Sequence, residues 1–259
     1  DITFRRAQDY LENAWVQEAR YCLNLTYEPV IRSLLRIDLD ENSTQKFDAL
    51  NSAQSYLSAM TTNNALVSDV LVYIVPGPDA LGYFVQADSA FHYPDIELDR
   101  LRTYVSAASS SYFFLAEAMP AMEADTAWVR FGDSMFYMRR FSANTQATGY
   151  AAVCLDNATM RSELASIMSD GSRTAHRTLV VSGGKILFDT ARNTHGSPVE
   201  HVLADYAPGR ERVELDGTSY RVSEVRSAAT GWTYMFLSGI NETDAQVRFA
   251  VTLAALVIL

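Results

Sequence analysis

The apolar residues of the chain change their spacing near residue 62, and this change limits the folds that the sequence can adopt. Before residue 62 they recur at alternating intervals of three and four, which predicts helices. After it they alternate with polar residues or form short solid runs, which predicts strands. The sequence therefore predicts an α+β protein in which long helices come first and antiparallel sheets follow.

The first helical pattern runs from residue 1 to about residue 36. Pro29 removes a backbone donor inside this pattern, so we expect a kink or a break near Tyr27 and Glu28. Glu18 interrupts an apolar stripe that is otherwise continuous. The stripe is formed by Phe4, Ala7, Leu11, Ala14, Tyr21 and Leu25.

A second helix is predicted after the acidic turn at residues 38–41. Asn42 and Gln45 form a start similar to a capping box, and we expect the helix to end near Thr62. Three apolar residues are predicted to supply its buried face. They are Phe47, Leu50 and Leu57.

Two groups of strands follow, separated by a Gly/Ser/Arg linker at residues 169–174. The first group also holds a mostly helical stretch at 96–105 and ends with a helix that runs from 156 to about 168. Its strands are predicted at 69–75, 81–85, 127–131, 134–141 and 149–155, with a Pro-Gly-Pro-Asp turn joining the first two into a hairpin. The second group is predicted at 177–182, 185–189, 210–215, 218–225 and 232–238, with a short helix at 199–206. Gly183-Gly184 and Asp216-Gly217 are typical of tight hairpin turns.

The last ten residues, 250–259, form an apolar run. A helix that spans a bilayer needs about 20 apolar residues, so we interpret this run as the first half of a transmembrane helix whose remainder lies beyond the sequence. The alternative is a helix or strand that packs in the core. The chain starts without Met or a signal peptide, inside a helical pattern, as expected if a further segment precedes it.

Charge and composition exclude several classes of function. The formal net charge of -10 would repel phosphate backbones, so no nucleic-acid partner is expected. Lys46 and Lys185 are the only lysines, and the predominance of arginine permits bidentate recognition of carboxylates without requiring it. Cys22 and Cys154 lack metal-ligand spacing, and we expect buried free thiols, with a disulfide as the alternative.

No arrangement of residues typical of catalysis or of a cofactor occurs in the sequence. The four histidines lack the spacing of a metal site or of a catalytic triad, and there is no Gly-x-Ser-x-Gly motif. Gly183-Gly184 is not followed by the Lys-Ser/Thr pair of a phosphate-binding loop. We therefore expect no enzyme activity, no bound metal and no cofactor.

The order of the predicted elements resembles the double Cache sensor domains of bacterial membrane receptors. Among these domains, the chain most resembles the sensor regions of membrane histidine kinases and of membrane-anchored AraC-type regulators. Four segments carry it: residues 64–75 (NALVSDVLVYIV), 149–156 (GYAAVCLD), 183–189 (GGKILFD) and 220–237, which contains RVSEVRSAATGWTYMFL. The resemblance implies two PAS-like antiparallel lobes, of which the membrane-distal one is larger. Its boundaries would be a helical stalk at 1–62, a distal lobe at 63–170, a proximal lobe at 171–240 and the start of a transmembrane helix at 241–259.

The same resemblance implies a function. The chain would lie outside the cytoplasm, anchored in the cell membrane by flanking helices, and would bind a small molecule in the distal lobe. The stalk and membrane helices would relay the signal to a cytoplasmic output, a histidine kinase first and an AraC-type regulator second, in a homodimeric receptor. The alternative is a structural or protein-binding ectodomain that dimerises and binds no small molecule. An extracellular hydrolase would need catalytic residues that the sequence lacks.

A ligand pocket needs apolar walls and a few convergent polar groups, and aromatic residues and arginines gather in the first group of strands. Alternation places Trp128 and Arg130 on one strand face, and Tyr137 and Arg139 on one face of the next strand. The arginines would bind an anionic group while the rings enclose the rest of the ligand. The alternative is that the arginines are solvated, or paired with Asp125 and Asp133, while the rings fill the core. The predicted ligand-binding residues are Tyr73, Tyr83, Tyr104, Tyr112, Trp128, Arg130, Tyr137, Arg139 and Asp156.

Asp156 enters this set through the resemblance. It stands at the end of the GYAAVCLD strand, where amino-acid-binding double Cache domains have an Asp that holds the ligand's amine. No Arg-x-Trp-Tyr string occurs in the chain, so the resemblance does not extend to an amino-acid ligand. The alternative role of Asp156 is that of the N-cap of the following helix.

Overall fold

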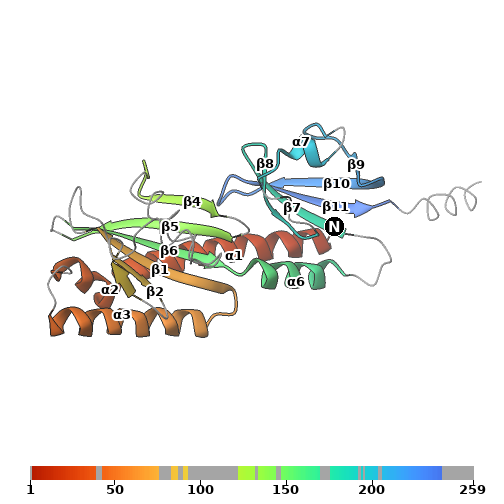
Figure 1. Ribbon diagram of the computed structural model, residues 1–259. Helices are drawn as coiled ribbons and strands as arrows, with labels where there is room; N and C mark the ends of the chain where they lie inside the picture. Colours follow the sequence, from red (N-terminus) through yellow and green to blue (C-terminus); the bar gives the residue numbers. More distant parts are fainter. Residues whose placement is uncertain are drawn as a thin grey trace, which may run out of the picture. The chain divides into compact units, whose positions relative to one another are not determined.

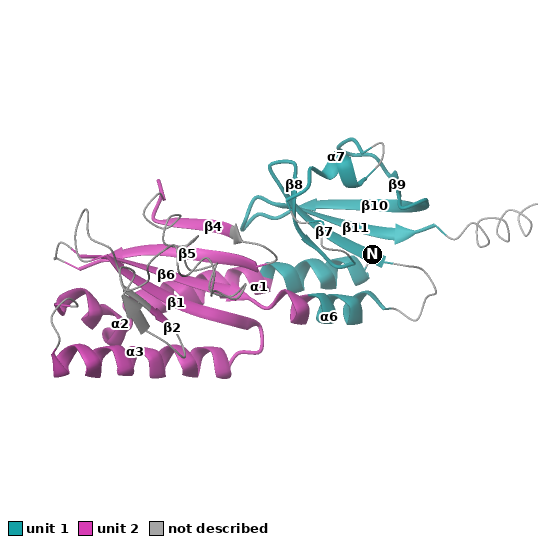
Figure 2. Cartoon of the chain, in the orientation of Figure 1, with its two compact units in different colours: residues 1–12, 161–259 teal, residues 13–160 magenta. Residues whose placement is uncertain are grey.

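The structure is a computed structural model that describes the greater part of the chain in two compact units. The described residues are 2–38, 43–75, 83–86, 90–92, 122–131, 134–143, 147–169, 176–191, 194, 196–203 and 206–240. Unit 1 combines residues 1–12 with 161–259, and unit 2 comprises residues 13–160 (Figure 2). Because the first helix contributes to both units, they divide the chain differently from the boundaries predicted from the sequence.

The first helical segment breaks where Pro29 predicts. Helix α1 spans Ile2–Tyr27, helix α2 spans Pro29–Ser33, and a 3-10 turn, η1, covers Leu34–Arg36 (Figure 1). Glu28, between the helices, has an extended backbone, and Pro29 takes the first position of α2, where no backbone donor is needed. The predicted break is confirmed.

Helix α3 spans Thr44–Thr62 and ends where predicted, but its start differs. Ser43 is the N-cap, and its hydroxyl accepts a hydrogen bond from the Lys46 N–H at 3.3 Å. The predicted cap, Asn42, lies outside the described residues, and since Ser43 fills that role the prediction was wrong by one residue. Phe47 is 54% exposed, so its assignment to the buried face was also wrong. The buried line starts one turn later, at Leu50, Ala53 and Leu57.

Unit 2 contains a six-stranded antiparallel sheet in the order β3-β2-β1-β6-β5-β4. Its strands are β1 (Val67–Val75), β2 (Tyr83–Gln86), β3 (Ala90–His92), β4 (Thr126–Phe131), β5 (Ser134–Ser142) and β6 (Thr148–Leu155). The predicted hairpin is confirmed, because β1 pairs antiparallel with β2. Strand β3 was not predicted, since three residues are too few to show alternation. The predicted helical stretch at 96–105 lies outside the described residues.

Unit 1 contains a five-stranded antiparallel sheet in the order β8-β7-β11-β10-β9. Its strands are β7 (His176–Ser182), β8 (Lys185–Asp189), β9 (Arg212–Leu215), β10 (Thr218–Arg226) and β11 (Thr233–Gly239). Helix α6 (Asn157–Met168) precedes them, and the short helix α7 (Val199–Val202) lies between β8 and β9. The α+β prediction, with a long N-terminal helix and two antiparallel sheets, is confirmed.

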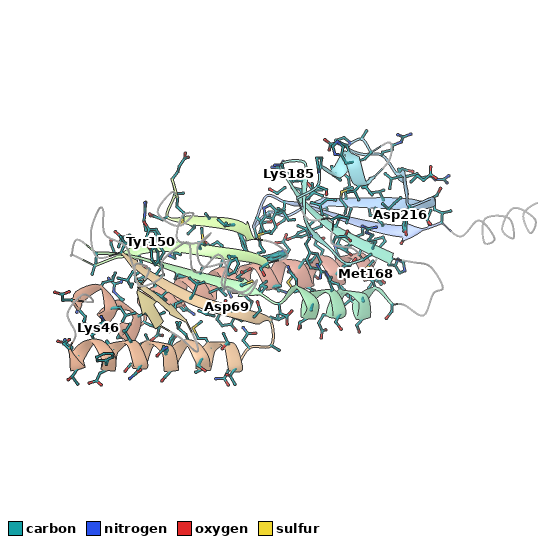
Figure 3. The ribbon with its side chains drawn as sticks, viewed as in Figure 1. Lys46, Asp69, Tyr150, Met168, Lys185 and Asp216 are labelled. Atoms are coloured by element: carbon teal, nitrogen blue, oxygen red, sulfur yellow. The ribbon has the colours of Figure 1, made fainter. Side chains whose placement is uncertain are left out.

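Both hairpin turns predicted for unit 1 form. Gly183 and Gly184 have φ angles of 54° and 75°, and Asp216 and Gly217 have 54° and 73°. Two consecutive positive φ angles characterise the type I′ turn, whose twist matches that of the strands it joins. Asp216 is visible at the turn between β9 and β10 (Figure 3).

A buried ion pair joins β7 to β8. The Arg177 Nε donates to Asp189 Oδ1 at 2.8 Å and its Nη2 to Oδ2, and the two residues are 4% and 0% exposed. Asp189 also accepts hydrogen bonds from the Ala191 N–H and the Thr194 hydroxyl. Burial disfavours the ionised carboxylate, but these hydrogen bonds outweigh it and hold the pKa of Asp189 below its ordinary value. Arg161 of α6 donates from Nε to the Asp189 backbone carbonyl at 3.0 Å, which ties the helix to the end of β8.

We predict that Asp189→Asn destabilises the chain by about 3–5 kcal/mol, because it leaves the buried Arg177 charge without its main partner. Asp125→Asn is the matched control. This substitution breaks the ion pair with Arg140, in which the side chains of Arg140 and Asp125 are 38% and 74% exposed. It should cost less than about 1 kcal/mol of stability, because an exposed ion pair contributes little. Urea unfolding followed by circular dichroism measures both losses.

The pH dependence gives a second outcome. Because the pKa of Asp189 is lowered in the folded state, its contribution to stability is present at neutral pH and is lost as the pH falls through the folded-state value. The Asp189→Asn variant should lack that part of the acid sensitivity. Equal losses of stability in Asp189→Asn and Asp125→Asn would show that the buried ion pair stabilises the fold no more than the exposed one.

Candidate ligand-binding site

The sheet of unit 2 has two faces with different coverings. Helix α3 lies along one side of it and packs on β1 and β2 (Figure 1). The unit 2 part of α1 packs on the same side, since the Cys22 thiol donates to the Ala151 carbonyl at 3.5 Å and the Tyr137 N–H donates to Glu18 at 3.3 Å. We call this side the helix face.

Aromatic rings fill part of the helix face. The rings of Trp15 in α1 and Trp128 in β4 meet edge to face, with centroids 5.5 Å apart. Trp128 also packs against Tyr137, its register partner in β5, at 4.7 Å. Arg139 shares the strand face of Tyr137 by alternation. These rings are therefore part of the packing between α1 and the sheet.

The opposite side of the sheet carries a buried cluster that we call the tyrosine face. Its members come from β1, β5, β6 and the segment before β4, and none carries a charge. They are Leu71, Tyr73, Met122, Phe136, Met138, Tyr150, Ala152 and Cys154.

Two tyrosines lie side by side on the tyrosine face. Tyr73 and Tyr150 are cross-strand partners, and their rings stack with centroids 6.3 Å apart at an interplanar angle of 29°. Tyr150 is 6% exposed, and burial raises the pKa of its hydroxyl, opposed in part by Arg140. The Tyr150 hydroxyl therefore stays protonated at neutral pH, and the hydroxyl of either tyrosine can donate a hydrogen bond. An aromatic body with a polar tip suits the wall of a small-molecule site.

Charged residues mark two ends of the tyrosine face. Asp69 is the register partner of Cys154 at one end of β1 (Figure 3). Near Tyr150, Arg140 donates from Nε and Nη2 to Asp125 Oδ1 at 3.1 and 2.8 Å. The described part of this face thus combines apolar and aromatic side chains with a charged residue at each of two ends, and Arg140 stands beside Tyr150 as its register partner.

Cys154 and Cys22 are both buried and free, so the expectation of buried thiols is confirmed. Burial raises the pKa of Cys154 to about 12, and it raises that of Cys22 as well. Neither thiol is a reactive nucleophile in this state.

The structure separates the predicted ligand-binding residues instead of bringing them together. Tyr73 lies on the tyrosine face, whereas Trp128, Tyr137 and Arg139 lie on the helix face. Tyr83 and Arg130 lie in β2 and β4, but their side chains are outside the described residues, as are Tyr104 and Tyr112 entirely.

Asp156 caps helix α6. Its Oδ1 accepts from the backbone N–H groups of Ala158 and Thr159 at 2.8 and 3.2 Å, and its Oδ2 accepts from the Thr159 hydroxyl at 3.0 Å. The N-cap interpretation is confirmed, and the carboxylate is occupied by these hydrogen bonds.

Sequence reasoning missed Tyr150. Residues 150–155 are all buried, so the strand shows no alternation that would tell one face from the other. Only the register with β1, which places Tyr150 beside Tyr73, identifies it.

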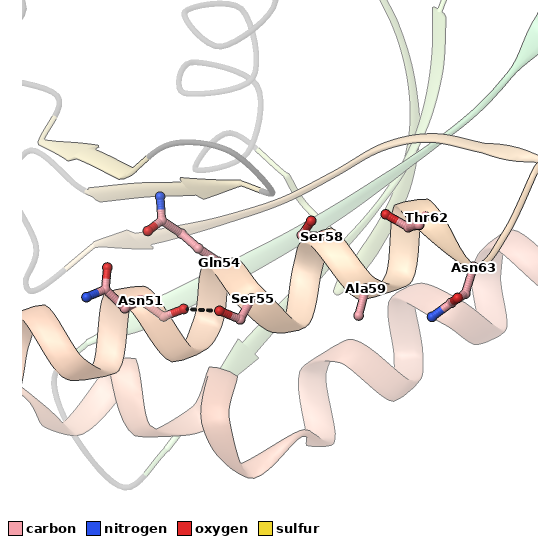
Figure 4. Close-up of a pocket in the computed structure, with 7 residues that line it drawn as sticks. All are labelled: Asn51, Gln54, Ser55, Ser58, Ala59, Thr62 and Asn63. Carbon is pink, nitrogen blue, oxygen red and sulfur yellow. Dashed lines mark hydrogen bonds between the residues drawn. The ribbon is translucent and has the colours of Figure 1, made fainter.

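Helix α3 also bounds an open hollow of about 650 Å³. Its lining residues come from this helix and its C-cap: Asn51, Gln54, Ser55, Ser58, Ala59, Thr62 and the C-cap Asn63. Gln54, Ser58 and Thr62 point to one side of the helix and Ser55, Ala59 and Asn63 to the other (Figure 4). Because a specific ligand site needs polar groups that converge from several elements, we assign no ligand to this hollow.

Within the described ranges, no group of three or more His, Cys, Asp or Glu side chains is arranged to hold a metal ion. None of the described helices has the length and apolar character needed to cross a membrane. The predicted start of a transmembrane helix at 241–259 lies outside the described residues.

Comparisons with known proteins identify the fold. No family model and no curated protein matches the sequence. Among solved structures, the ligand-binding domain of the Pseudomonas aeruginosa amino acid chemoreceptor PctC, in complex with GABA, has 19% sequence identity and a TM-score of 0.54. That match covers 93% of this chain and 96% of that one.

Two sensor domains of histidine kinases are similar to the same degree. The sensor domain of the V. cholerae histidine kinase DctB has 12% identity, a TM-score of 0.53 and coverage of 92% of this chain and 95% of that one. The extracellular domain of the putative histidine kinase soHK1S-Z6 has 12% identity, a TM-score of 0.55 and coverage of 93% and 92%. The chain therefore shares the fold of these ligand-binding and sensor domains, as the order of its elements predicts.

We predict that Asp156→Ala destabilises unit 2 and α6 by about 1 kcal/mol, because two helix N–H groups lose their acceptor. Asp156→Asn should retain most of the stability, since its amide oxygen can replace Oδ1. Urea unfolding of the two variants beside wild type checks both values. An Asn variant as unstable as the Ala variant would show that the charge, not the cap, is what matters at this position.

Proposed function

We propose that the chain is the extracytoplasmic ligand-sensing part of a bacterial membrane receptor and that its unit 2 binds a small molecule. The fold supports this, because structures that share it are ligand-binding or sensor domains of chemoreceptors and histidine kinases. Two of these were solved with GABA and with L-Arg. A fold alone does not set a function, so the proposal also needs a site.

The stacked pair of Tyr73 and Tyr150 carries the proposal for the site. The helix face of the sheet is occupied by α1, through Trp15 and Cys22, and by α3. A ligand on this sheet would therefore use the tyrosine face. Its apolar part would pack on the two rings, and the two hydroxyls would provide hydrogen bonds to a polar group.

We propose that Trp128, Tyr137 and Arg139 do not contact the ligand directly. Their rings and strand positions place them against α1, so they would act on ligand binding only through the packing of that helix. Tyr104 and Tyr112 remain candidates for the same site as Tyr73. Tyr83 is the register partner of Ile74 and Arg130 follows Trp128 by two residues, so both take strand positions of the helix face.

The receptor we propose is a homodimer anchored in the cell membrane by helices that flank the sensor. Its cytoplasmic output would be a histidine kinase, in keeping with the two kinase sensor domains of similar fold, with an AraC-type regulator as the second candidate. Helices α1 and α6 each contribute residues to both units, so they are the elements through which a change in unit 2 could reach unit 1. A ligand would drive this change only through its different affinity for two states of the protein.

The proposal predicts that one class of small molecule stabilises the chain in a thermal-shift screen. Amino acids, carboxylates, amines and uncharged aromatic compounds make up the library. At about a hundred times its dissociation constant, a ligand stabilises the folded state by about 2.7 kcal/mol. No response across the library would instead favour a dimerising ectodomain without a small-molecule ligand.

Tyrosine variants then locate the site by calorimetry. Tyr73→Phe and Tyr150→Phe keep the stacked rings but remove the hydroxyls, and each should weaken binding roughly 2- to 10-fold through one lost hydrogen bond. Tyr220→Phe in β10 of unit 1 is the matched control and should leave the affinity unchanged. If both unit 2 variants bind like wild type, the ligand does not use the tyrosine face.

A further inference from the structure

A carboxyl group lies fully buried between α1 and the sheet of unit 2. Glu18 interrupts the apolar stripe of α1, yet it is 0% exposed. Its Oε1 accepts a hydrogen bond from the Tyr137 N–H at 3.3 Å. Its Oε2 is buried and has no hydrogen-bond partner among the described residues.

The surroundings of Glu18 are mainly apolar. One turn earlier in α1 lies Trp15, which is 1% exposed and packs on Trp128, and one turn later lies Cys22, which is 0% exposed. The Tyr137 ring completes the group from β5 by packing on Trp128. Among the described residues, a negative charge in such a site loses its hydration and gains only the hydrogen bond from the Tyr137 N–H.

Titratable and charged groups near Glu18 come from α1 and from the strands on which it packs. On α1 the titratable group is the Cys22 thiol, whose pKa is raised by burial and further by Glu18. On β6 it is the Cys154 thiol, whose pKa is also raised by burial and further by Glu18. On β5 the positive charge is Arg139, which acts on Cys22 in the opposite sense. Arg130 of β4 shares the helix face by register, but its side chain is outside the described residues.

Burial dominates this balance. It raises the pKa of Glu18 well above its ordinary value, and the hydrogen bond from the Tyr137 N–H lowers it only in part. The folded protein therefore binds a proton at Glu18 under conditions in which an exposed glutamate is ionised.

We propose that Glu18 is a proton-binding site through which external pH controls how firmly α1 packs on the sheet of unit 2. With the proton bound, the carboxyl is neutral and the helix stays seated against Trp128 and Tyr137. When the proton leaves, the charge favours states in which α1 has moved away and water reaches the carboxylate. Because α1 belongs to both units, this change occurs in an element that unit 1 shares. The proposal does not depend on any ligand at the tyrosine face.

The sign of the effect follows from proton linkage. A folded-state pKa above the unfolded one means that the folded protein holds more protons, so stability falls as the pH rises above the ordinary pKa of glutamate. At acid pH, wild type and a neutral variant should be alike at this position, and at higher pH the wild type should be the less stable of the two.

Thermal unfolding of wild type, Glu18→Gln and Asp48→Asn from about pH 5 to about pH 8 tests the proposal. Asp48 is an exposed carboxyl on α3 of the same unit and serves as the matched control. We expect the unfolding midpoint of wild type to fall below that of Glu18→Gln by a gap that widens by several degrees across this range. Asp48→Asn should follow wild type. A constant gap between wild type and Glu18→Gln would overturn the proposal.

A measurement on wild type alone covers the case in which Glu18→Gln does not fold. Infrared spectroscopy should detect the carbonyl stretch of one protonated carboxyl near neutral pH, and hydrogen exchange, corrected for its intrinsic pH dependence, should show residues 13–27 losing protection as the pH rises. Absence of the protonated carboxyl band, or protection of residues 13–27 that does not change with pH, would overturn the proposal equally.

Discussion

The packing of α1 on one face of the unit 2 sheet is the constraint on which the rest of that unit depends. Ala14, Trp15, Cys22 and Leu25 are all buried, and they occupy the side of the sheet that Val153 and its neighbours present. A sheet has only two faces, and because helices cover one of them, the ligand site that we propose lies on the other. The same packing encloses Glu18. The contact between α1 and the unit 2 sheet therefore affects both the proposed ligand site and the proposed proton-binding site.

The two sheets have cores of different character. In unit 1 the buried members of the cluster on one sheet face are aliphatic apart from a single methionine, with Leu179 and Leu237 among them, and the partly buried Tyr206 and Tyr220 pack against it. In unit 2 the tyrosine face contains two tyrosines, a phenylalanine and two methionines. Aliphatic side chains interdigitate densely and leave little to recognise, whereas aromatic and thioether groups adapt to a guest. This contrast supports a division in which unit 2 binds and unit 1 transmits.

Much of the fold could be predicted from the sequence because several residues mark the ends of helices and the positions of turns. Pro29 ends α1, Gly183-Gly184 and Asp216-Gly217 form their turns, and Asp156 caps α6, since each of these residues has a local conformational reason for its place. The site could not be predicted in the same way. Residues 70–74 and 150–155 are buried on both faces, so periodicity does not show which tyrosine meets which partner. Glu18 could be identified as an interruption of the stripe, but its burial depends on strands more than a hundred residues later.

The state of Cys22 and Cys154 bears on whether the fold depends on oxidising conditions. Both thiols are buried, unpaired and held in the protonated form by their environment, so the mature protein contains no covalent link among its described residues that an oxidant must create or a reductant could remove. Side-chain packing and the hydrogen bonds of its sheet stabilise each unit, and in unit 1 the Arg177–Asp189 pair adds to them. The folded state that the structure describes therefore requires no disulfide between these two cysteines.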